Sequence, residues 1–94
     1  MGNNEINKEK LIKNMTENLP MLRTRLDLTQ EELAEKIGVS RSTILSIENK
    51  KREMTWNTFL SLMLLFTKNE ATNKLLMVLD IYTDEFHDFI KEER

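Results

Sequence analysis

The sequence predicts an all-α protein. Apolar residues recur at spacings of three and four, Ser, Thr or Asn stands where helices should begin, and no long segment alternates apolar and polar residues. The 94 residues contain two Gly and one Pro, which is too few for an all-β fold with many tight turns. The length suits one core, so we treat residues 1–94 as a single domain.

The first predicted helix carries an apolar stripe at helical spacing. The stripe consists of Leu11, Met15, Leu19, Leu22 and Leu26. Pro20 interrupts it, and Asn18 is placed to cap a helix that has Pro20 in its first turn. The sequence therefore predicts a kink or a break near Asn18, with the helix running on to about Leu26.

Two short helices follow, joined by a tight turn. Thr29 and Glu32 form a capping box that begins the first helix, and Gly38 ends it. Ser40 caps the second helix. The residues predicted to face the core are Leu33, Ala34, Ile37, Ile44 and Ile47.

The turn between these two helices has the pattern of a helix-turn-helix. Gly38 supplies the positive φ that a tight connection needs. Ala34, four residues earlier, is small enough to let two crossing helices approach, while Ile44 and Ile47 hold the second helix against the first. A small residue, a Gly and then apolar residues at these offsets are what a helix-turn-helix requires, and we place it at residues 29–49.

Three more helices are predicted after a polar, basic turn at residues 49–53. They extend over about residues 56–66, 70–81 and 84–91. Thr55 caps the first of them, which is apolar nearly all round and is therefore expected to be central. Thr83 caps the last one, whose apolar face consists of Phe86, Phe89 and Ile90.

These residues resemble the phage repressor and Cro-like helix-turn-helix domains, also called the XRE family. The resemblance covers about residues 19–76 and rests on Thr29-Gln30, Leu33-Ala34, Gly38-Val39-Ser40, Ile44, Ile47-Glu48-Asn49 and Arg23. It implies a lambda repressor-like five-helix domain that binds DNA, usually as a two-fold dimer. Residues 18–76 are then the helix-turn-helix core, residues 1–17 an N-terminal helical extension, and residues 77–94 a C-terminal extension with an additional helix, a candidate for dimerisation.

The second helix of the motif, at about residues 41–48, is expected to enter the major groove with its N-terminal part at the base edges. With Ile44 and Ile47 facing inward, the opposite strip consists of Arg41, Ser42, Leu45 and Ser46. Arg41 is suited to a guanine edge and Leu45 to a thymine methyl group, although Leu45 as a minor core residue is the alternative. Ser42 and Ser46 donate and accept without discriminating between bases.

A second set of residues is expected to contact phosphates. Thr29 and Ser40 stand at helix N-termini, whose amides favour a nearby anion. The resemblance implies a phosphate contact for Gln30, together with a contact that braces the recognition helix. The other expected phosphate contacts follow the recognition helix, at Asn49, Lys50, Lys51 and Arg52. The alternative is that these residues form an ordinary solvated turn.

Two further expectations follow from the resemblance. Arg23 and Glu48 occupy the positions of a structural ion pair that ties the first helix to the end of the recognition helix. The family commonly has Gly where this chain has Lys50. Asn49 or Lys50 must therefore take the left-handed conformation, which Asn tolerates better.

Composition excludes several other functions. The absence of Cys excludes disulfides, thiolate zinc sites and Cys nucleophiles, and the single His87 argues against a His-based metal site or triad. There is no Gly-rich phosphate loop and no acidic pair in a plausible cleft. We therefore expect no enzymatic activity, no cofactor and no metal. Without an apparent targeting or membrane-spanning segment, a cytoplasmic protein with no membrane contact is expected.

The charges are unevenly distributed along the chain. The net charge is −2, but residues 36–52 hold five basic residues and one acidic residue. Residues 80–94 hold six acidic residues and two basic ones. The sequence therefore predicts a basic segment on the DNA side and an acidic tail that faces away from DNA.

The C-terminal segment is rich in apolar residues, and two interpretations are open. The residues concerned are Leu75, Leu79, Tyr82, Phe86, Phe89 and Ile90. They complete the core of the monomer, or they bury against a second copy to form a homodimer with the two-fold symmetry that a palindromic site needs. We favour the homodimer because the central helix is already apolar nearly all round.

Two functions are compatible with the sequence. The first is a sequence-specific DNA-binding transcriptional regulator. The alternative is the antitoxin of a toxin–antitoxin system, which binds its own operator and a toxin partner. A neighbouring toxin gene, or a second small protein that co-purifies, would distinguish the antitoxin.

Overall fold

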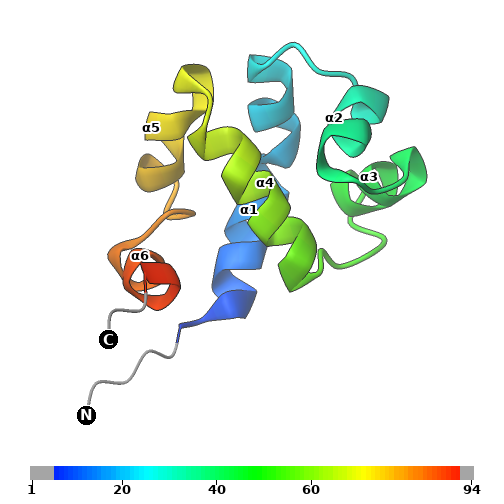
Figure 1. The fold of residues 1–94 in the computed structure, drawn as a ribbon. Coiled ribbons are helices and arrows are strands. Elements are labelled where there is room, and N and C mark those ends of the chain that lie inside the picture. The colour runs from blue at the N-terminus through cyan, green and yellow to red at the C-terminus, as the bar shows by residue number, and fades with distance from the viewer. Residues whose placement is uncertain (1–5, 92–94) are drawn as a thin grey trace.

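The computed structural model describes residues 6–91, and this part of the chain folds into six helices without a strand (Figure 1). The helices are α1 (Lys8–Arg25), α2 (Gln30–Ile37), α3 (Arg41–Glu48), α4 (Trp56–Thr67), α5 (Glu70–Val78) and α6 (Asp84–Lys91). The predicted all-α fold class is confirmed, with α6 as the additional helix after the five of the expected domain.

Helices α1 and α4 form the centre of the molecule. Figure 1 shows α4 crossing α1, with α2 and α3 on one side and α5 and α6 on the other. Helix α2 packs against both α3 and α4, while α3 also contacts α1. The two motif helices are therefore supported from behind by both central helices.

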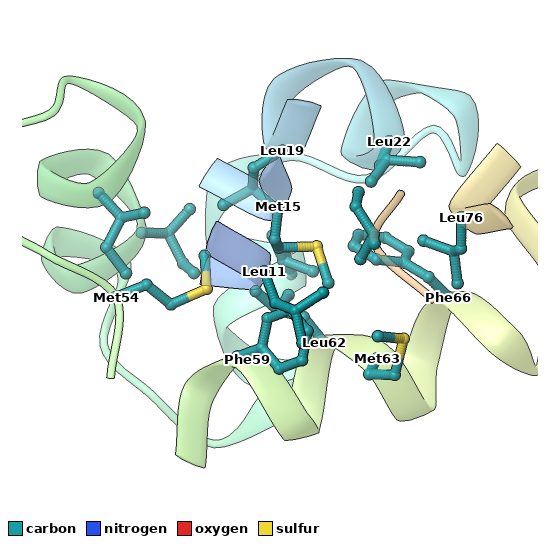
Figure 2. Close-up of a cluster of buried hydrophobic side chains, with 14 of the residues drawn as sticks. Leu11, Met15, Leu19, Leu22, Met54, Phe59, Leu62, Met63, Phe66 and Leu76 are labelled. Atoms are coloured by element: carbon teal, nitrogen blue, oxygen red, sulfur yellow. The ribbon is translucent and has the colours of Figure 1, made fainter. Parts of the chain in front are cut away.

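The apolar stripe of α1 is the spine of the core. Met15, Leu19 and Leu22 are completely buried, and Leu11 is nearly so. Figure 2 shows these side chains facing α4, which contributes Phe59, Leu62, Met63 and Phe66. The other elements complete this core with Leu33, Ala34, Ile44, Ile47, Met54, Leu76, Ile81 and Phe86.

The predicted break near Asn18 is wrong. Helix α1 is continuous from Lys8 to Arg25 and contains Pro20 in its interior. Asn18 does not cap a helix, because its side-chain amide donates to the carbonyl oxygen of Asn14 at 2.8 Å. A Pro inside a helix costs about 3 kcal/mol, and burial of the leucines on either side of Pro20 offsets that cost. Residues 8–17 of the expected N-terminal extension therefore belong to the same helix as the first residues of the core.

Side-chain caps begin α4 and α6 where the sequence places them. The Thr55 hydroxyl accepts from the backbone N–H of Thr58, and the Thr83 hydroxyl accepts from that of Phe86, both at 3.1 Å. Helix α5 ends at Val78, three residues before the expected Ile81. The chain leaves the helix there because Asp80 takes a positive φ of 59°, which turns the apolar Ile81 into the core.

Helix α6 is attached to the core through aromatic side chains. Phe86 is 3% exposed and meets Trp56, Phe59 and Tyr82 in edge-on geometry, with ring centroids 6.2, 5.8 and 5.3 Å away. The ammonium group of Lys8 lies 5.0 Å from the centre of the Trp56 ring. These contacts join the last helix to the beginning of α1 and of α4.

We predict that Phe86→Ala lowers the free energy of unfolding by about 3–5 kcal/mol, because it leaves a cavity among packed aromatic rings. Asp88→Ala on the same helix is the control, since Asp88 is exposed, and should change the free energy of unfolding by no more than about 0.5 kcal/mol. Urea denaturation of both variants measures the difference. Equal, small effects would mean that α6 is not part of the cooperative core.

Candidate nucleic-acid interface

The turn between α2 and α3 has the geometry that its sequence demands. The Thr29 hydroxyl accepts from the backbone N–H of Glu32, and the Glu32 carboxylate accepts from that of Thr29, which completes the capping box. Gly38 ends α2 with a φ of 79°, a conformation strained for any residue with a side chain. Ser40 then caps α3 by accepting from the backbone N–H of Thr43.

Helix α3 has one buried side and one outward side. Ile44 and Ile47 are at most 1% exposed and hold the helix against the core. The residues predicted to read bases lie on the remaining surface, with Arg41 and Ser42 exposed and Leu45 and Ser46 partly buried. Within the described residues, Leu45 is not among the hydrophobic side chains that pack against the main core. The outward strip is therefore free of a core role.

The carboxylate of Glu48 joins three helices. Arg23 on α1 donates from Nε to Oε2 of Glu48 at 2.9 Å and from Nη2 to Oε1 at 3.1 Å. Gln30 on α2 donates from Nε2 to the same Oε1 at 2.9 Å. Arg23 also donates to the carbonyl oxygen of Leu28 at 2.8 Å, which fixes the segment before α2. The Glu48 side chain is 6% exposed, so these bonds form largely out of water.

Gln30 thus lies where the resemblance implies a bracing contact. Its side-chain amide donates a hydrogen bond to Glu48, the last residue of α3. The expected ion pair between Arg23 and Glu48 is present in the structure with two-pronged geometry.

The basic turn after α3 follows a defined path. Asn49 has a φ of −86°, and Lys50, not Asn49, takes the left-handed conformation with a φ of 61°. The backbone N–H groups of Lys50 and Lys51 bond back to the carbonyl oxygens of Ile47 and Ser46 at 3.0 and 2.9 Å. This is the helix end that the resembling family makes with Gly, formed here by Lys at the cost of local strain.

The side chains of residues 49–52 are exposed, and that of Arg52 is in addition held by a hydrogen bond. Asn49, Lys50 and Lys51 lie on the surface, as does Arg52. Arg52 donates from Nη1 to the hydroxyl oxygen of Thr43 in α3 at 2.9 Å. Sequence reasoning missed Thr43, because its contact depends on the path of the turn and no spacing rule connects residues nine apart across a helix end.

The acidic residues of α6 lie far from α3. Figure 1 shows α6 and α3 at opposite ends of the molecule. Asp84, Glu85 and Asp88 are exposed on α6. The described acidic residues of α6 therefore lie away from α3, the predicted recognition helix.

A comparison with protein families decides the identity of this segment. Residues 21–55, from the second half of α1 to the cap of α4, match the family model described as Helix-turn-helix. The match covers less than half of the 94 residues and includes the helix-turn-helix predicted at residues 29–49. The match supports DNA binding by this segment. No curated protein and no solved structure matches the chain.

Within residues 6–91, no group of His, Asp or Glu side chains is arranged to hold a metal ion. No helix in that range combines the length and the apolar character needed to cross a membrane.

We predict that Glu48→Gln lowers the free energy of unfolding by about 3–5 kcal/mol, because it leaves the largely buried Arg23 guanidinium without its counter-charge. Thermal and urea unfolding measure the loss. Glu17→Gln is the control, since its pair with Lys13 is exposed and contributes about 0.5 kcal/mol or less. Similar effects of the two substitutions would contradict a structural role for Glu48.

Proposed function

We propose that this protein is a sequence-specific transcriptional regulator that inserts α3 into the DNA major groove, as a two-fold dimer. The strongest support for this proposal comes from the two sides of α3. The buried side of α3 is committed to the core through Ile44 and Ile47, while its outward strip lies beside an exposed basic turn. An exposed helix face with flanking cations is what major-groove binding uses.

Each residue of the outward strip has a role suited to its chemistry. Arg41, exposed in the first turn of α3, donates two hydrogen bonds to the edge of a guanine. Ser42 and Ser46 bond to either kind of edge and add little discrimination. Leu45 contributes an apolar contact to a thymine methyl group, which its separation from the main core supports.

Phosphate contacts then set the position of the protein on the duplex. The first turns of α2 and α3, capped by Thr29 and Ser40, direct backbone amides outward. Asn49, Lys50 and Lys51 lie exposed at the other end of α3 and contact the flanking backbone. In this arrangement Gln30 serves mainly to hold Glu48, and phosphate contact is its secondary role.

A dimer interface is proposed on the C-terminal helices, with a narrower set of residues than the sequence suggests. Leu75, Leu79 and Tyr82 pack against the chain's own core, and Phe86 and Phe89 meet Trp56. These five side chains fit the monomer-core interpretation. The apolar residues left exposed on α5 and α6 are Met77 at 65%, Val78 at 78% and Ile90 at 51%. Burial of these side chains against a second copy favours association.

Selection of binding sites from random DNA tests the proposed function. We predict that the wild-type protein enriches a two-fold motif with half-sites about 34–36 Å apart, one helical turn. Arg41→Ala should lose about 1–3 kcal/mol of binding free energy on that motif and relax the base preference at one position of each half-site.

Lys51→Ala is the matched control for this selection. It should weaken binding to all sequences alike and flatten the dependence of affinity on salt, because one phosphate contact is lost. Equal losses on every sequence for Arg41→Ala would exclude base reading by Arg41. No enriched motif for the wild-type protein would refute sequence-specific binding altogether.

We predict that Val78→Glu weakens self-association at least tenfold while leaving the fold intact, because Val78 is exposed in the monomer and a buried, unpaired carboxylate is costly in an interface. Sedimentation equilibrium measures the change. Asn73→Glu, also at an exposed position of α5, adds the same charge and is the control. A wild-type protein that stays monomeric, or a Val78→Glu variant that still dimerises normally, would contradict this interface.

A further inference from the structure

The N-terminal end of α3 is linked to the basic turn by a chain of side-chain hydrogen bonds. The Ser40 hydroxyl caps α3 and lies 2.9 Å from the Thr43 hydroxyl. Thr43 in turn accepts from Nη1 of Arg52 at 2.9 Å. Arg52, in the turn that follows α3, is thereby held back against the beginning of the same helix.

Few other contacts hold the middle of this turn. Lys51 bonds to α3 through its backbone N–H, and Met54 anchors the end of the turn by burying its side chain. Between them, Arg52 and Glu53 are exposed. Over residues 50–53 of the described chain, the bond to Thr43 is the side-chain hydrogen bond that reaches another element. Lys50 adds backbone strain at the start of the turn, with its φ of 61°.

We propose that Thr43 is a positioning residue for DNA binding, which holds Arg52 so that the basic turn has its binding shape before DNA arrives. This inference rests on the proposed function and gives a role to a residue outside the base-reading and phosphate-binding sets. A turn that is ordered in advance loses less conformational entropy on binding, so its cations bind more tightly. The guanidinium group has five N–H donors and uses one on Thr43, which leaves it able to bond a phosphate from the held position.

The proposed role of Thr43 differs from the roles of its neighbours on α3. Arg41 and Ser42 are proposed to meet bases, so their substitution changes base preference. Thr43 is only partly exposed, and its hydroxyl is already engaged by Ser40 and Arg52. Its loss therefore changes affinity on all sequences and leaves base preference as it was.

The test uses a double-mutant cycle in the full chain. Thr43→Val keeps the shape of the side chain, removes the hydroxyl, and leaves the Ser40 cap able to accept from the backbone of residue 43. Arg52→Gln removes the guanidinium. Thr67→Val is the matched control, because the Thr67 hydroxyl donates only to the carbonyl oxygen of Leu64 in α4.

Thr43→Val should weaken binding about two- to tenfold on both selected and random DNA, the effect of one hydrogen bond. Base preference should stay unchanged, and Thr67→Val should bind as the wild type does. In the Arg52→Gln background, Thr43→Val should have no further effect, because Thr43 acts through Arg52. Independent, multiplying effects, an altered base preference or an unchanged affinity would each overturn the proposal.

Amide hydrogen exchange in the free protein gives a readout that does not require DNA. Thr43→Val should speed exchange at the backbone N–H groups of Lys50 and Lys51 at least severalfold, with the melting temperature close to that of the wild type. Unchanged exchange there would refute the bracing role even if the protein binds DNA. Absence of DNA binding by the wild type, with faster exchange in the variant, would refute the proposed function and leave the brace standing.

Discussion

The carboxylate of Glu48 is the point on which the orientation of the recognition helix depends. Glu48 is the last residue of α3, where a negative charge opposes the helix dipole and is unfavourable unless it is compensated. Arg23 compensates that charge with two hydrogen bonds, and Gln30 adds a third from α2. Because the three residues come from three helices, their geometry fixes α3 relative to α1 and α2. A shift of any one helix would separate a largely buried charge from its partners.

This constraint explains how a helix of eight residues can be held rigidly in the fold. An isolated helix of that length is unstable in water, so its stability must come from tertiary contacts. Ile44 and Ile47 hold its buried side, the Ser40 cap its beginning, and Glu48 its end. The contacts that hold α3 in the fold are therefore made by its buried side and its two ends. The outward strip is left without a role in the core, as the proposed base-reading surface requires.

Local features of the fold could be predicted from the sequence, and features that depend on tertiary contacts could not. The caps at Thr29, Ser40 and Thr55 follow from residues within one turn, and so do the left-handed Gly38 and the buried side of α3. Pro20 misled the prediction, because local chemistry disfavours a helix that the burial of Leu19 and Leu22 nevertheless maintains.

The candidate site divides in the same way. Helical periodicity is enough to place Arg41 and Leu45 on the outward side of α3. The contact between Arg52 and Thr43 needs the three-dimensional path of the turn, which the left-handed Lys50 sets and which no spacing in the sequence specifies. The net charge of −2 hides an uneven distribution, because Figure 1 shows α3 and the acidic α6 at opposite ends of the molecule. Under the proposed function, such a separation orients the protein toward DNA but adds little overall attraction. The proposed binding therefore depends on contacts made in the correct geometry, and the bonds of Glu48 hold α3 in that geometry.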